Sequence, residues 1–256
     1  MHPAFALAFG AVSYGVFFAT FLYLVGFLGN VVVPKSVDSG TPGALGAAVL
    51  VNTALLLLFG VQHSVMARPA FKRWWTRFVP QPIERSTYVL ASSAVLIALM
   101  AWWRPIAEPV WAIETPALRA AMMALFFGGV GLVLFSTFLI DHFDLFGLRQ
   151  VVLHFRNRDY SERHFVMPVL YRFVRHPLYI GWIVTFWAAP TMSAGHFLFA
   201  LVMTGYILVA IPMEERDLAQ LHGEPYRRWR EATPAFVPRI GTSRTDTAPS
   251  SAAEPA

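Results

Sequence analysis

The chain alternates long apolar stretches with short polar segments. A helix needs about twenty consecutive apolar residues to cross a bilayer. Runs of about that length occupy Ala4–Val33, Gly43–Val65, Ser86–Trp103 and Leu118–Ile140. The pattern therefore predicts four transmembrane helices.

A further apolar region near the C-terminus is interrupted. Leu178–Ala189 is short, Pro190 to Gly195 supplies turn residues, and His196–Pro212 follows. We expect a helical hairpin here, made either of two full spans or of a pair that enters the bilayer and returns. The predicted fold is an all-α integral membrane protein with four transmembrane helices, this hairpin (five to six spans in total) and a cytoplasmic C-terminal segment.

We expect residues 1–239 to form a single transmembrane domain, in which 171–239 is the cofactor-binding part. Residues 240–256 are rich in Ser, Thr, Ala and Pro, and this composition is typical of a disordered tail. The apolar run at the N-terminus is much longer than the core of a signal peptide, which favours a retained span.

Composition supports the membrane assignment and limits the chemistry. Hydrophobic residues make up 56% of the chain, charged residues only 14%, and the mean hydropathy is +0.52. The chain has no cysteine, which excludes disulfides, thiolate metal sites and a cysteine nucleophile. Any chemistry must therefore rest on histidine, carboxylates, tyrosine or a bound cofactor.

The net charge of +5 could indicate nucleic-acid binding, but the basic residues lie in loops beside apolar spans. Of the 20 Lys and Arg residues, 17 fall in residues 66–85, in residues 141–177 or after Pro212. Cytoplasmic loops carry such an excess. We therefore expect both termini in the cytoplasm and the protein in the bacterial inner membrane.

Polar residues inside or beside apolar spans are costly, and so they are candidates for function. His63 lies near the cytoplasmic end of the second span, and Asp141, His142 and Asp144 directly follow the fourth. Each has a structural alternative, because the aspartates could cap a span end and His63 could be a core histidine. Their convergence at one depth favours a catalytic group.

The sequence RHPLYIG opens the hairpin. Pro177 suits the first position of a helix, which makes His176 the expected N-cap and leaves the backbone amides from Leu178 onward without partners. Such a helix start favours an anion, for example a carboxylate. Near this helix start, Arg175 adds a positive charge and Tyr179 offers an aromatic ring and a hydroxyl. Gly181 allows close approach of a ligand or of a neighbouring helix.

Two glutamates, Glu214 and Glu215, close the same hairpin. They could instead belong to a solvated helix face with local ion pairs. The chain has no HExxH motif, and we do not expect a metal site.

The last quarter of the chain resembles the isoprenylcysteine carboxyl methyltransferase superfamily of membrane methyltransferases. The matching residues are Arg175, His176, Pro177, Tyr179, Gly181, Glu214, Glu215, Leu218, Gly223, Tyr226, Trp229, Pro234 and Pro238. Two earlier segments, His63–Trp75 and Asp141–Val151, are similar to the methanethiol S-methyltransferase branch and to its relatives, the NnrU-type nitric-oxide-response membrane proteins.

The resemblance implies S-adenosyl-L-methionine as cofactor, held between the hairpin and the C-terminal segment. The amides after His176 and the Arg175 guanidinium would bind its carboxylate, and Glu214 or Glu215 its ribose hydroxyls or amine. Aromatic walls for the adenine would come from Tyr179, Tyr226 and Trp229, although the last two could instead be aromatic residues at the membrane interface.

The narrower resemblance implies S-methylation of a small thiol, from methanethiol to dimethyl sulfide. Small thiols are mostly protonated at neutral pH, so a base is useful, and the candidates are His63, Asp141, His142 and Asp144. If His142 is the base, we expect an adjacent carboxylate to raise its pKa and orient its ring. Alternatives are a nitric-oxide-linked membrane protein without this activity, and a membrane reductase of the same architecture.

Overall fold

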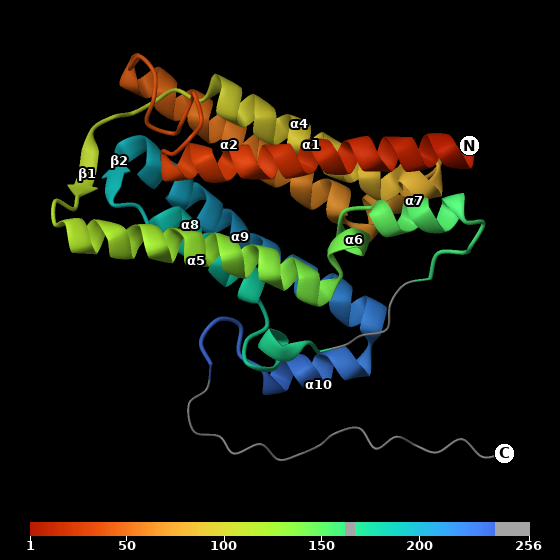
Figure 1. Cartoon of the computed structure of the whole chain (residues 1–256). Coiled ribbons are helices and arrows are strands. Elements are labelled where there is room, and N and C mark those ends of the chain that lie inside the picture. The colour runs from red at the N-terminus through yellow and green to blue at the C-terminus, as the bar shows by residue number, and fades with distance from the viewer. Residues whose placement is uncertain (162–166, 239–256) are drawn as a thin grey trace.

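The computed structural model describes residues 1–161 and 167–238 (Figure 1). Four long helices match the four predicted spans to within a few residues, and a fifth long helix closes the bundle. They are α1 (Pro3–Gly29), α2 (Leu45–Ala67), α4 (Glu84–Trp102), α5 (Pro116–Ile140) and α9 (Ala194–His222). In the described part of the chain, these five are long and apolar enough to cross a membrane. The predicted all-α membrane fold is confirmed, while the tail expected over 240–256 lies outside the described residues.

The helices form two layers. Figure 1 shows α1, α2 and α4 on one side and α5, α8 (Pro177–Trp187) and α9 on the other. Large side chains from both layers fill the space between them, among them Phe27, Trp103, Phe126 and Phe199, all buried. Other apolar side chains such as Leu50 and Val209 point outward and are exposed. Helices that are apolar on both faces suit a bundle surrounded by lipid.

The predicted hairpin crosses the whole bundle, although its first helix is short. Helix α8 has 11 residues and spans only about 16 Å at 1.5 Å per residue. An extended segment completes the path, because strand β2 (Thr191–Ser193) pairs antiparallel with β1 (Pro109–Ala112) in the α4–α5 connection. We call this side of the molecule the β-pair end.

The second arm of the hairpin is longer than expected. We expected it to stop at Pro212, but α9 continues through this proline to His222. Proline lacks the amide hydrogen of one helical bond, yet membrane helices tolerate it where neighbouring groups compensate. One continuous helix therefore fixes Glu214 and Glu215 relative to α8.

Short elements gather at the opposite side, which we call the α6 end. Helix α7 contacts α1, and His154 Nε2 lies 3.4 Å from the Met1 carbonyl oxygen, so the chain starts where α5 finishes. The described chain therefore crosses the bundle an even number of times. The short elements are α3 (Pro69–Trp75), η1 (Gln81–Ile83), α6 (His142–Leu145), α7 (Leu148–Phe155), η2 (Val169–Arg172) and α10 (Glu224–Ala232).

Candidate active site

Helix α8 begins as its sequence predicts. Pro177 is its first residue, and the Ile180 amide donates to the His176 carbonyl oxygen at 3.1 Å. Within residues 1–161 and 167–238, the amides of Leu178 and Tyr179 have no acceptor. The helix start therefore offers two amide donors and a positive dipole end.

Glu215 links the two arms of the hairpin. Its Oε1 accepts from Arg175 Nε at 2.8 Å and lies 2.9 Å from His176 Nε2. The glutamate is only 8% exposed, and a carboxylate can stay charged at such a position only with partners of this kind. Glu215 is therefore held inside the protein, facing the histidine that precedes α8.

Arg175 makes several bonds within the protein. Its Nη1 donates to the carbonyl oxygens of Arg230 (2.7 Å) and Thr233 (2.6 Å), and its backbone amide donates to the Pro234 carbonyl oxygen at 2.9 Å. These bonds, together with Glu215, tie the segment after α10 to the start of α8. The guanidinium expected to bind a ligand carboxylate thus makes its described bonds within the protein.

Glu214 lies in a ring of tyrosines. The Tyr179 hydroxyl donates to Glu214 Oε2 at 2.6 Å, and the carboxylate also acts electrostatically on Tyr88 and Tyr206. Burial raises the pKa of Tyr171, and the nearby Glu214 charge raises it further. Glu214 is half-buried, so its carboxylate is the more accessible of the two.

His63 adjoins this ring through Tyr88. The Tyr88 hydroxyl lies 3.0 Å from each ring nitrogen of His63, and Ser92 Oγ lies 3.3 Å from Nδ1. Phe59 stacks on the imidazole with ring centroids 5.2 Å apart. Helices α2 and α4 thus bring a predicted acceptor-side histidine next to a tyrosine on which Glu214 acts.

The sequence reasoning missed three of the tyrosines, Tyr88, Tyr171 and Tyr206. Two of them lie inside predicted apolar spans, Tyr88 near the start of its span and Tyr206 within the hairpin. The criterion that selected His63, a polar group inside an apolar span, would also have selected these two. Tyr171 lies in a short 3₁₀ helix and had no such signal.

His142 occupies a separate aromatic cage. Its Nε2 lies 2.8 Å from the Tyr14 hydroxyl and its Nδ1 lies 2.9 Å from Thr137 Oγ1, while Phe138 stacks on the ring at 4.2 Å. Burial lowers the pKa of His142, and the Asp141 charge acts in the opposite direction. Asp141 thus acts in the expected direction although burial outweighs it, and hydroxyl groups contact both ring nitrogens.

The two aspartates shape the corner between α5 and α7. Asp141 caps α6, because its Oδ1 accepts from the Asp144 amide at 3.2 Å. The Asp144 carboxylate accepts from Arg149 at 3.2 Å and from Gln150 at 3.1 Å. These hydrogen bonds stay within residues 141–150, and those of the His142 ring go to Tyr14 and Thr137. The His63 ring instead contacts Tyr88 and Ser92 on α4.

Tyr226 and Trp229 lie in the interior. Their exposed fractions are 1% and 9%, and their ring centroids are 5.3 Å apart. Trp229 Nε1 donates to the Tyr171 carbonyl oxygen at 2.9 Å, and burial raises the pKa of Tyr226. Their burial disfavours the alternative that they are exposed aromatic residues at the membrane interface.

Gly181 provides close packing between helices. A Cβ at this position would lie 2.8 Å from the Gly129 carbonyl oxygen on α5. Of the two expected uses of this glycine, close approach of a ligand or of a neighbouring helix, the structure shows the helix contact.

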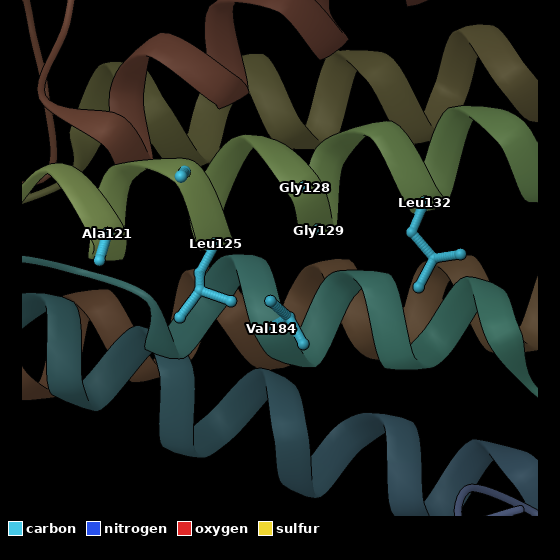
Figure 2. A pocket seen from close by; sticks show the side chains of 7 residues that line it. Ala121, Leu125, Gly128, Gly129, Leu132 and Val184 are labelled. Atoms are coloured by element: carbon cyan, nitrogen blue, oxygen red, sulfur yellow. The ribbon is translucent and has the colours of Figure 1, made fainter.

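An apolar groove lies beside this crossing. It has a volume of about 580 Å³, and Figure 2 shows its lining side chains on the facing sides of α5 and α8. The lining residues are Ala121, Ala124, Leu125, Gly128, Gly129, Leu132 and Val184. No lining side chain has a polar group, so the groove cannot orient a charged ligand, and the polar cluster around Glu214 remains the candidate site.

The fold is that of an integral membrane protein, with a cluster of polar side chains at one end of its helical bundle. The chain is 53% identical over 232 residues to methanethiol S-methyltransferase of Mycobacterium tuberculosis, an alignment that covers 91% of this chain and 95% of that protein. It is 51% identical over 242 residues to methanethiol S-methyltransferase 2 of Bradyrhizobium diazoefficiens, covering 94% and 93%. The chain belongs to the methanethiol S-methyltransferase family.

A more distant relative also aligns with most of the chain. Nurim of Rattus norvegicus is 31% identical over 250 aligned positions, covering 88% of this chain and 90% of that protein. No model of a protein family and no solved structure matches the chain.

Proposed function

We propose that this protein transfers a methyl group from S-adenosyl-L-methionine to methanethiol, giving dimethyl sulfide and S-adenosylhomocysteine. The names of its relatives support the acceptor. The cluster of Glu214 with Tyr179, beside the open amides of α8, is the observation that carries the choice of donor. It combines anion-binding and cation-binding groups within one hairpin.

The residues present fit that donor. S-adenosylmethionine has a carboxylate, an ammonium group, ribose hydroxyls and a sulfonium. The amides of Leu178 and Tyr179 would donate to the carboxylate, and Glu214 would accept from the ammonium or the hydroxyls. In the described ranges Glu214 forms no ion pair with Lys or Arg, so its charge favours a cationic ligand.

His63 would act on the acceptor. When bound, S-adenosylmethionine supplies an electrophilic methyl group. A thiol with a pKa near the cysteine value of about 8.5 is mostly protonated at neutral pH, so His63 would accept the thiol proton and release it to water afterwards. Tyr88 would orient the imidazole, and Phe59 would hold it by stacking on one face of the ring. One carbon–sulfur bond breaks at the donor as one forms at the thiol sulfur.

The same proposal places the protein in the bacterial inner membrane with both termini in the cytoplasm. The split of 17 basic residues against three supports this orientation. The three exceptions, Lys35, Arg104 and Arg119, all lie toward the β-pair end. The polar cluster would then face the cytoplasm, which contains the cellular methyl donor.

Turnover by the purified protein tests the proposal. Detergent-solubilised protein is mixed with S-adenosylmethionine and methanethiol. Headspace gas chromatography measures the dimethyl sulfide formed, and liquid chromatography of the solution measures S-adenosylhomocysteine. We expect a ratio of one to one. Binding of NADPH without binding of S-adenosylmethionine would favour the reductase alternative, and absence of both would favour the nitric-oxide-linked one.

A further inference from the structure

A second hollow lies at the β-pair end, opposite the Glu214 cluster. It has a volume of about 510 Å³ and is bounded by the end of α1, the first turns of α5 and the segment between α8 and β2. Most of its wall is apolar, including Leu28, Phe126 and Pro190. Two charged residues of opposite sign, Asp38 and Arg119, also line it.

The Asp38 carboxylate is fixed in place from two sides. Asn30 Nδ2 donates to Oδ2 at 2.7 Å, and the Ser193 hydroxyl donates to Oδ1. Asn30 caps α1 in the left-handed backbone conformation, and Val32 nearby has a φ of 66°, which β-branched residues rarely adopt. Residues with strained backbone angles of this kind are found preferentially at ligand sites. A carboxylate accepts up to about four hydrogen bonds, so Asp38 can accept more.

Arg119 is also held from within the protein. Its Nη1 donates to the Ile113 carbonyl oxygen at 3.1 Å and approaches Thr191 Oγ1 at 3.5 Å. Its Nε and Nη2 groups make no bond within residues 1–161 and 167–238. A guanidinium has five N–H donors in a planar fork, so most of its donors remain for a ligand.

The two charges share one hollow but do not pair with each other: in the described part of the chain, no ion pair joins Asp38 to Arg119. From this arrangement we propose a second ligand site, which binds the headgroup of an aminophospholipid such as phosphatidylethanolamine. Arg119 binds the phosphate and Asp38 accepts from the primary ammonium. A negative and a positive side chain together suit a zwitterionic headgroup, whereas the Asp38 charge would repel a purely anionic lipid.

The surroundings favour a lipid over a soluble zwitterion. The hollow lies at the end of the bundle beside the first turns of α5, and the headgroups of a bilayer lie at the ends of membrane-spanning helices. Leu118, next to Arg119, is 56% exposed and Ala120 is also exposed, so an acyl chain can leave the hollow along an apolar surface. The site is at the far end from Glu214, and the lipid is therefore bound and not methylated.

Lipid selectivity of the full chain tests this site. The protein is placed in nanodiscs with equal amounts of phosphatidylethanolamine, phosphatidylcholine and phosphatidylglycerol, and native mass spectrometry counts the lipids that it retains. We expect about tenfold preference for phosphatidylethanolamine over phosphatidylcholine, whose quaternary ammonium cannot donate a hydrogen bond. Asp38→Asn should abolish this preference, because Asp38 accepts from the ammonium. Arg119→Gln should lower the retention of both lipids, because the phosphate that Arg119 binds is common to them.

Matched controls come from the same end of the molecule. Glu108→Gln and Arg104→Gln remove exposed charges that do not line the hollow, and both should keep the wild-type preference. Arg119 is exposed, so its variant should fold even if Asp38→Asn does not.

Two results would overturn the proposal. One is equal retention of the three lipids by wild-type protein, a preference that survives Asp38→Asn, or lipid retention that Arg119→Gln leaves unchanged. The other is displacement of the lipid by water-soluble phosphoethanolamine at similar concentration, which would identify a site for a soluble zwitterion.

Discussion

Glu214 and Glu215 are neighbours in the chain but have different surroundings. Successive residues of a helix point about 100° apart, so both cannot face the same group. Sequence reasoning placed Arg175 and His176 at the start of the hairpin and the two glutamates at its end, and in the structure Glu215 contacts both of these residues. The sequence alone could not decide which of the two carboxylates pairs with groups inside the protein, because this depends on the rotation of α9 relative to α8.

Glu215→Gln should destabilise the protein. The variant leaves the Arg175 guanidinium buried without its carboxylate, and breaking a buried pair costs about 3–5 kcal/mol. For a chain of this size we expect the melting temperature to fall by at least about 6 °C, measured by differential scanning fluorimetry in detergent. Glu224→Gln is the control, because its ion pair with Arg228 is exposed and should contribute almost nothing. Equal melting temperatures for both variants would contradict the role of Glu215.

His63 and Tyr88 should control the acceptor step. Tyr88→Phe and His63→Gln should lower kcat by about 10²–10⁴-fold, the range for losing a general base or its positioning, while the affinity for S-adenosylmethionine stays unchanged. The steady-state rate of dimethyl sulfide formation gives kcat, and equilibrium dialysis gives the affinity for S-adenosylmethionine. His142→Ala in the same assay tests the sequence-based prediction for that residue. A loss confined to His142→Ala would move the base to the cage beside Tyr14.

At the level of elements, the crossing of α5 and α8 depends on small residues. A Cβ at Gly129 would lie 2.6 Å from Thr185 Oγ1 and 2.8 Å from the Gly181 carbonyl oxygen. At the preceding residue, Gly128, an added Cβ would have no atom of a neighbouring helix within 4 Å. The two neighbouring glycines therefore allow the same substitution to be compared in a closed and an open position.

Gly129→Ala should lower stability and Gly128→Ala should not. Overpacking a tight contact costs about 1–3 kcal/mol, because the backbones of α5 and α8 must move apart. Thermal melting of the two variants in the same detergent measures the difference. A melting temperature for Gly129→Ala equal to that of Gly128→Ala would show that the crossing is loose.

The long elements could be predicted from sequence, and the short ones could not. Runs of apolar residues long enough to cross a bilayer give a strong signal, so α1, α2, α4 and α5 were found. The strands of the β1–β2 pair have four and three residues, too few for the alternation of apolar and polar residues to be recognised. The two strands are also separated in the sequence by helices α5 to α8. Pro212 reads as a helix stop, and only the packing around α9 shows that the helix continues.

At the level of the whole molecule, the start of α1 and the end of α9 lie on the same side. Sequence reasoning reached this topology from the loop charges, and the structure adds the β-pair that shows how far the hairpin extends. The chain contains no cysteine, so single cysteines can report the orientation without background.

Val110→Cys on β1 and Trp74→Cys at the α6 end are suitable reporters, because both side chains are exposed. With a membrane-impermeant maleimide added to spheroplasts, we expect Val110→Cys to be labelled at once and Trp74→Cys only after the membrane is opened. The reverse pattern would place the termini outside, against the positive-inside rule.

The assignment of Glu214 to the methyl donor has the most direct test. Equilibrium dialysis with radiolabelled S-adenosylmethionine compares wild-type protein with Glu214→Gln, in which Tyr179 can still donate to the amide oxygen and the fold is kept. Losing a charge-assisted bond of about 1.5–3 kcal/mol raises the Kd about tenfold or more. We predict that increase with an unchanged melting temperature. An unchanged Kd in a folded Glu214→Gln protein would contradict the site proposed around this residue.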